Sequence, residues 1–257
     1  MSTVRAAPGV QIWLAPVVFG VVVLALWQIG TTALGVPSFL LPSPTSIAEQ
    51  FGANASGIRA AATATGTNAL IGLVAGAVLG FAGAVFAVRW NVVDSLLSPL
   101  AAAAAAVPIV ALAPLLNSMY GTSTDVPRRI TVAVVVFFPI FVSVAEGLRQ
   151  VPAVHLELMH VYAVGEWRAT RTVRIPAALP FLFTGLRVAA PGAVIAAIVA
   201  EYFGGLQNGL GSRITSAAAN TAYPRAWAYV LGAMAVGLLF FLVVLALERL
   251  ASRRRSR

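Results

Sequence analysis

The sequence predicts an all-α membrane protein with about six transmembrane helices. Of its 257 residues, 60% are hydrophobic and only 10% are charged, whereas soluble domains carry about 25% charged residues. The mean hydropathy is +0.90. The apolar residues also fall in long blocks, which a soluble bundle with a single core would not need. A chain of this composition lacks the polar surface that a water-soluble protein requires.

Six apolar segments approach or exceed the roughly 20 residues that a helix needs to cross a bilayer. We expect these spans at residues 12–34, 66–88, 95–118, 130–148, 181–203 and 226–248. The first is longer than the roughly 7–15 apolar residues of a signal peptide and follows one basic residue, Arg5, which favours a retained helix. The third contains Pro99, Pro108 and Pro114, so we expect it to be kinked or broken. No internal repeat or second soluble domain is visible, and residues 1–257 are expected to form a single transmembrane domain.

The distribution of arginine predicts the orientation. The chain carries 17 basic residues, all of them arginine, and 8 acidic ones. With the N-terminus inside, the outer parts hold Arg59, Arg128, Arg129, Arg213 and Arg225, and the other 12 arginines are cytoplasmic. By the positive-inside rule, both termini are expected in the cytoplasm. The arginines flank apolar blocks and do not interleave with aromatic residues, so we expect membrane lipid around the chain and no nucleic acid partner.

The sequence offers no catalytic or metal site. It contains no cysteine, which excludes disulfides, thiolate metal ligands and cysteine nucleophiles. His155 and His160 lie about 140° apart around a helix and do not share a face. No nucleotide-binding motif occurs in a suitable strand-to-helix context. We therefore expect a non-enzymatic chain that itself binds no metal or cofactor.

The connection at residues 150–180, expected inside, is longer than a simple connector requires. Pro152 can begin a helix, and Ala153–Tyr162 is expected to continue it, with good helix formers around Glu157. After Gly165, a second short helix is expected from Glu166 to Val173, ending at Ile175-Pro176. Two short helices with a bend between them predict a projection from the membrane, here called loop 150–180.

Residues 157–176 of this loop resemble the cytoplasmic loop motif of ABC importer permeases. That motif begins Glu-Ala-Ala, has a glycine six residues after the glutamate and ends in Leu-Pro. Glu157 takes the glutamate position, and Ile175-Pro176 takes the closing pair. Ala163 stands where the glycine is expected, so Gly165, two residues later, is expected to supply the bend instead.

Further segments are similar to the nitrate/sulfonate/taurine-type permeases of the binding-protein-dependent transport inner-membrane family. These segments are Leu41-Pro42-Ser43-Pro44, residues 107–121, Phe137-Phe138-Pro139, Pro176–Pro180 and Thr184–Arg187. The resemblance implies a type I ABC importer permease in the bacterial cell membrane. Such a permease forms either a homodimer with a second copy of itself or a pair with another permease. The resemblance also implies an extracytoplasmic solute-binding protein and separate ATPase subunits, which would bind ATP and Mg²⁺.

The resemblance further implies that loop 150–180 couples the permease to the ATPase. Glu157 would hold the loop by capping or by pairing with an arginine. Val161, Tyr162 and Trp167 would anchor it through apolar contacts. Arg168 or Arg171 would contact the ATPase, although each could instead be only a topology determinant. The full expected coupling set is Glu157, Val161, Tyr162, Ala163, Gly165, Trp167, Arg168, Arg171, Ile175 and Pro176.

Three polar residues are candidates for lining the translocation path, namely Asn68, Asn117 and Glu201. For Glu201, the alternative is a side chain that snorkels to the outer interface. An ion-coupled secondary transporter is the rival class, but such proteins place ionisable groups mid-membrane, where these spans have almost none. Members of the family transport sulfonates, taurine, nitrate or pyrimidine- and riboflavin-like compounds, and residues 200–220 look like the vitamin-precursor branch.

Overall fold

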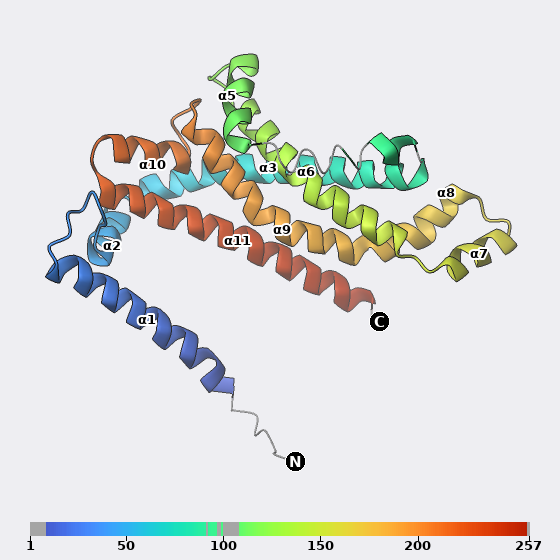
Figure 1. The fold of residues 1–257 in the computed structure, drawn as a ribbon, viewed down its shortest axis with the longest axis horizontal. Coiled ribbons are helices and arrows are strands. Elements are labelled where there is room, and N and C mark those ends of the chain that lie inside the picture. The colour runs from blue at the N-terminus through green and yellow to red at the C-terminus, as the bar shows by residue number, and fades with distance from the viewer. Residues whose placement is uncertain (1–8, 91, 97–98, 100–107, 256–257) are drawn as a thin grey trace, which may run out of the picture.

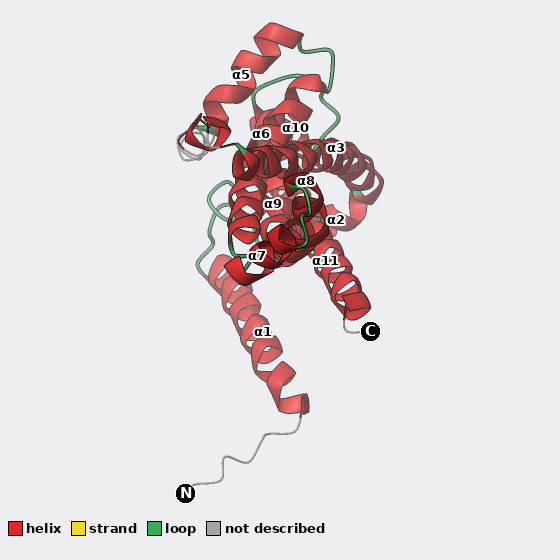
Figure 2. Ribbon diagram, turned by 90° about the vertical axis from the view of Figure 1, so that its right-hand side faces the viewer, coloured by secondary structure: helices red, strands yellow, loops and turns green. Residues whose placement is uncertain are grey.

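The computed structural model describes residues 9–90, 92–96, 99 and 108–255, and all the regular structure in this part is helical (Figures 1 and 2). Five helical segments are long and apolar enough to cross a membrane. They comprise α1 (Gly9–Ala33), α3 (Ala55–Arg89), α6 (Val126–Arg149), α9 (Ile175–Tyr202) with the turns before it, and α11 (Tyr223–Arg255). The shorter helices are α2 (Pro44–Ala53), α5 (Ile109–Tyr120), α7 (Ala153–Val161), α8 (Glu166–Ala169) and α10 (Leu210–Ala219). The expected all-α membrane architecture is confirmed.

The third expected span, residues 95–118, lies partly outside the described residues. Its described part contains α5, a helix of 12 residues, which is too short to cross a bilayer of about 30 Å at 1.5 Å per residue. Pro108 precedes α5 with an extended backbone (φ −67°, ψ 114°). The expected break in this segment is therefore confirmed at Pro108.

Two spans are longer than hydropathy predicts. The helix α3 begins at Ala55, eleven residues before the expected start at residue 66, because the small and polar residues of its first turns are helical without being strongly apolar. The fifth span runs without interruption from Glu166 to Tyr202. The prediction that a helix ends at Ile175-Pro176 is therefore wrong.

A π-helical turn explains how the helix passes Pro176. Residues Thr170–Arg174 form this turn, in which the Ile175 N–H donates to the carbonyl of Thr170, five residues back. Proline cannot donate the usual i→i−4 bond, and its ring clashes with that carbonyl. The wider π turn shifts the hydrogen-bond register just before the proline. The α8 helix thus continues into α9 instead of stopping.

Close packing of α3 on α6 forms the centre of the bundle. Gly72, Gly76 and Gly80 lie one turn apart on α3 and face α6. A Cβ on Gly76 would lie 2.5 Å from the carbonyl oxygen of Ala133, closer than two such atoms can approach. Small residues at this spacing allow two membrane helices to pack closely. The buried core around them includes Val136 and extends to Ala193 of α9.

The two ends of the bundle are formed by different helices. Figure 1 shows α7, α8 and the last turns of α11 at one end, here called the α7 end, and α2, α10 and the first turns of α11 at the other, the α10 end. The helix α1 diverges from the bundle and contacts it mainly near α2 (Figure 1). Its attachments include the Trp27–Trp227 ring contact and a hydrogen bond from the Thr45 N–H to Gln28.

Candidate functional sites at the two ends of the bundle

At the α7 end, the bend of loop 150–180 is built from backbone hydrogen bonds. The Val164 N–H donates to the Met159 carbonyl at 2.9 Å, and the Ala163 N–H donates to the His160 carbonyl at 2.9 Å. This pair of bonds is a Schellman motif, which requires a left-handed residue just after the helix. Ala163 is that residue, with φ 54°.

The prediction that Gly165 supplies the bend is therefore wrong. Gly165 has φ −60° and ψ 147° and serves as the N-cap of α8, a conformation that any residue adopts. Ala163 takes the left-handed position itself, at a cost of roughly 1 kcal/mol relative to glycine. The family motif's glycine at this position has a direct physical reason: a residue without Cβ adopts positive φ freely.

The prediction that Glu157 holds the loop by capping or arginine pairing is also wrong. Its side chain is exposed and makes no hydrogen bond or ion pair within the described part of the chain. The internal polar contact of the loop joins His160 Nε2 to Glu166 Oε1 at 4.0 Å. Glu157 is in the second turn of α7, which leaves its carboxylate free to meet a partner.

The expected anchors project from this end of the molecule. Val161 is 80% exposed, Tyr162 72% and Trp167 59%, although all three are apolar or aromatic. Arg168 and Arg171 are exposed beside them. Ile175 and Pro176 are partly buried where α9 begins, and Ala169 and Thr170 are buried. The tip of the loop is thus apolar, and its base packs into the bundle.

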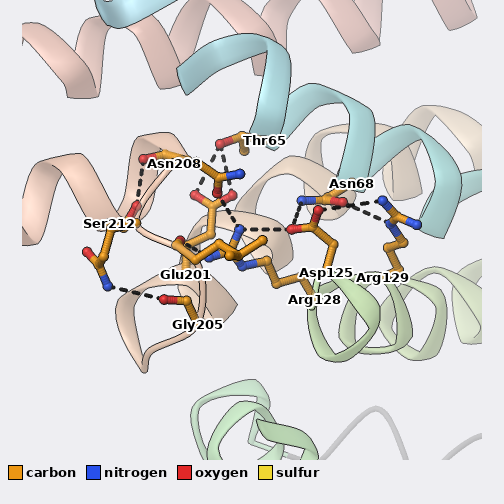
Figure 3. A network of polar contacts seen from close by, with 12 residues as sticks. Thr65, Asn68, Asp125, Arg128, Arg129, Glu201, Gly205, Asn208 and Ser212 are labelled. Carbon is orange, nitrogen blue, oxygen red and sulfur yellow. Dashed lines mark hydrogen bonds and ion pairs between the residues drawn. The ribbon is translucent and has the colours of Figure 1, made fainter. Parts of the chain in front are cut away.

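At the α10 end, Glu201 is enclosed by the protein (Figure 3). Its side chain is 1% exposed. Thr65 donates its hydroxyl to the carboxylate at 3.0 and 3.1 Å, and the Gly211 N–H donates to Oε2 at 2.8 Å. The snorkelling alternative for Glu201 is therefore wrong, because the carboxylate is buried in the protein and bonded to α3 and α10. In this conformation it does not line an open path.

Arg128 forms the second half of this network (Figure 3). Arg128 is 1% exposed. Its guanidinium donates from one terminal nitrogen to Asp125 at 3.1 Å and to Asn208 at 2.8 Å. The other terminal nitrogen donates to the Leu206 carbonyl. Its Nε has no hydrogen-bond partner. The residue was expected only as one of the outer arginines, yet it is the largest of the fully buried side chains in the described part of the chain.

The two candidate asparagines join the same network from other helices. Asn68 of α3 donates to Asp125 at 3.0 Å and accepts from Arg129 at 2.9 Å. Asn117 of α5 donates to the Phe203 carbonyl at 3.3 Å. All three candidate path residues therefore gather at the α10 end. That these three residues line the translocation path stays a prediction.

Sequence reasoning missed Thr65, Arg128, Asn208 and the role of two glycines. Gly209 and Gly211 lie against the Glu201 side chain: a Cβ on Gly209 would collide with its carboxylate, and one on Gly211 would lie 2.8 Å from its Cβ. The available signal was Gly209-Leu-Gly211 shortly after a glutamate that ends an apolar span. No periodicity, however, indicates that Thr65, 136 residues away, completes the site.

The described chain is thus an all-helical bundle with a polar network at the α10 end and an exposed two-helix projection at the α7 end. Residues 72–257 match the family of binding-protein-dependent transport system inner membrane components. The chain belongs to this family, and is thus a multi-pass membrane permease subunit of an ABC importer.

Relatives of this chain carry different substrate names. The riboflavin transport system permease protein RibX of Chloroflexus aurantiacus is 31% identical over 76% of this chain and 72% of its own length. The formylaminopyrimidine transport permease protein ThiX of Halalkalibacterium halodurans is 32% identical over 77% and 78%. The putative aliphatic sulfonates transport permease protein SsuC of Bacillus subtilis is 28% identical over 96% and 91%.

Proposed function

We propose that two copies of this chain form a translocation path and that loop 150–180 of each copy docks into a separate ABC ATPase. The observation that carries the proposal is the apolar tip of the loop, with Val161 80% and Tyr162 72% exposed. ATP and Mg²⁺ would be bound by the ATPase, and solute would be delivered by a solute-binding protein at the α10 end.

The loop has the properties of a docking element. A helix of nine residues such as α7 is marginal in isolation, and none of its residues is buried in the described chain. Its exposed apolar side chains are flanked by Glu157, Arg168 and Arg171, which suits a protein groove with a polar rim better than lipid hydrocarbon. The continuous helix from Glu166 to Tyr202 would transmit motion of the loop directly into the bundle.

Pairing with a second copy is supported by helices that this chain leaves uncovered. Only 6% of the α1 span is buried. The 12-residue helix α5 exposes Leu115 (62%) and Met119 (72%), although a helix this short cannot span the bilayer. Helix ends within a membrane need protein or a water-filled cavity around them. A second copy at α5 would supply both the protein contact and the path.

The proposed solute is a small heteroaromatic vitamin or vitamin precursor. Relatives named for riboflavin and formylaminopyrimidine transport are each more than 30% identical over about three quarters of the chain. An aliphatic sulfonate is the second candidate, because the sulfonate relative aligns over 96% of the chain.

Purification and reconstitution test these assignments. The tagged chain, extracted from native membranes, should retain an ABC ATPase and behave as a dimer by mass measurement in nanodiscs. Proteoliposomes that contain this complex and its solute-binding protein should accumulate riboflavin or formylaminopyrimidine. This uptake should occur only when ATP is present on the side of the membrane that carries the ATPase. A monomer that retains no ATPase would overturn the docking and dimer proposals, and ATP-dependent uptake of taurine alone would move the solute to the sulfonate class.

A further inference from the structure

We infer that residues 203–209, here called the strap, close the α10 end of this permease, and that Glu201 and Arg128 are the positioning residues that hold the strap in place. The inference builds on the proposed function, since a closure matters only to a chain that forms a path. The strap connects α9 to α10 and is bonded to two further helices, α5 and α6.

Hydrogen bonds attach the strap to α5 and α6. Asn117 of α5 donates to the carbonyl of Phe203. Arg128 of α6 donates to the carbonyl of Leu206 and to the side chain of Asn208, the latter at 2.8 Å. One buried guanidinium therefore binds the middle of the strap at two points (Figure 3).

The far end of the strap is fixed because two other helices cap α10. The N-cap of α10 is Gly209, which has no side chain to satisfy the first N–H groups. Thr65 of α3 accepts from the Leu210 N–H at 2.8 Å, and Glu201 of α9 accepts from the Gly211 N–H at 2.8 Å. A carboxylate at a helix N-terminus is favoured by both the hydrogen bond and the helix dipole. Loss of Glu201 would free α10 and the strap together.

The strap is also built to move. Gly204 and Gly205 follow each other with φ 117° and 90°, a backbone that residues with a Cβ rarely adopt. Polar and charged contacts fasten the strap, and such contacts can be exchanged. Asp125 pairs with both Arg128, at 3.1 Å, and Arg129, at 3.6 Å. The unpartnered Nε of Arg128 leaves the closed arrangement incompletely satisfied, so a second arrangement can compete with it.

The reactivity of a buried thiol distinguishes a strap that opens from a polar network that only stabilises the fold. Ser212 of α10 is 1% exposed and donates to the carbonyl of Gly209, the last residue of the strap, at 2.9 Å. Because the chain contains no cysteine, Ser212→Cys gives a single thiol that becomes reactive only when the strap lifts. Thr131→Cys, at a position 0% exposed within α6, is a matched thiol that only general unfolding would expose.

The experiment measures maleimide labelling of Ser212→Cys in nanodiscs. For the chain alone, Glu201→Ala and Asn208→Ala should each raise the labelling rate about tenfold, because each removes a hydrogen bond to a buried charged or helix-capping group. Asn208 is exposed, so its variant should fold even if Glu201→Ala does not. Arg187→Gln, which breaks the separate α9–α11 ion pair with Glu248, should leave the rate unchanged. Thr131→Cys should stay unlabelled throughout.

With ATPase and solute-binding protein added, labelling of Ser212→Cys in the otherwise unmodified chain should rise during ATP turnover and fall back with ADP. Equal labelling of Ser212→Cys and Thr131→Cys in the strap variants would assign the network a general stability role and overturn the inference. Unchanged labelling in both Glu201→Ala and Asn208→Ala would also overturn it. Faster labelling in the strap variants of a preparation that retains no ATPase would contradict the proposed docking. It would still support the inference about the strap.

Discussion

Val164 donates its backbone N–H to the carbonyl of Met159 at 2.9 Å, and this bond turns the chain away from α7 toward α8. The turn passes through Ala163 at φ 54°. The geometry of the proposed docking loop therefore depends on a residue that is poorly suited to its own conformation.

Ala163→Gly should stabilise the loop by about 1 kcal/mol, because glycine adopts positive φ without the Cβ clash. Gly165→Ala should change stability by less than about 0.5 kcal/mol, since Gly165 has an ordinary φ of −60° and open space around it. Hydrogen exchange of the 159–164 amides in each variant measures the effect. Slower exchange in Ala163→Gly and unchanged exchange in Gly165→Ala are expected; the reverse pattern would return the bend to Gly165.

Trp167→Ala and Tyr162→Ala should weaken binding of the ATPase. Both side chains are more than half exposed, and a buried aromatic anchor at an interface contributes about 2 kcal/mol or more, roughly a 30-fold change in affinity. Membrane insertion should be unaffected, because neither substitution lies in a buried core. ATPase retention and solute uptake at matched membrane abundance provide the measurement.

Glu157→Ala should also reduce ATPase retention or coupling, because it would remove contacts between the loop and the ATPase. The carboxylate has no partner within the described chain, so its removal would cost only contacts with the ATPase, about 1.5–3 kcal/mol for a charge-assisted hydrogen bond. His155→Ala is the control on the same exposed helix. Normal ATPase retention and uptake in Glu157→Ala, Tyr162→Ala and Trp167→Ala together would leave the loop as a simple connector.

Gly76→Ala should destabilise the bundle by about 1–3 kcal/mol, because the new methyl group would lie 2.5 Å from the Ala133 carbonyl in a packed interface. Gly66→Ala is a matched substitution on the same helix, where the nearest atom would be 3.9 Å away. It should be neutral or stabilising, since alanine favours helix by about 1 kcal/mol over glycine. Thermal unfolding in detergent compares the two. Equal melting temperatures would contradict the close α3–α6 contact.

The sequence predicted the spans because hydropathy is a property of each segment by itself. The apolar blocks that became α1, α6 and α11 needed no knowledge of their neighbours. A helix end was predicted at Ile175-Pro176 because a proline normally ends a helix. The π turn at Thr170–Arg174 that accommodates Pro176 has no sequence signature. The start of α3 was missed because residues 55–65 are helical but not strongly apolar.

The network at the α10 end was only partly predictable, because it depends on packing between distant segments. Glu201 was recognisable as an ionisable residue at the end of a span. Thr65 is brought to Glu201 by the packing of α3 on α9, and the Gly211 N–H by the packing of α10 on α9. At the α7 end, the motif located the loop, but its backbone angles were needed to choose between Ala163 and Gly165 as the bend.

The last prediction concerns orientation, which the arginine distribution assigns by the positive-inside rule. The expected cytoplasmic parts include loop 150–180 and the end of α11, which Figure 1 places at the same end of the bundle. Single cysteines at Val161 and Ser252 should resist a membrane-impermeant maleimide in intact cells and react after permeabilisation, while one at Ser56 should react in both.

These three positions are exposed, so a lack of labelling can be attributed to the membrane and not to burial. A cysteine at Thr170, which is 5% exposed, could not make that distinction. The cysteine-free chain needs no other substitution. Because the α7 end carries the proposed ATPase contact, labelling of Val161→Cys from outside intact cells would reverse the topology. It would also exclude a cytoplasmic ATPase as the partner of the loop.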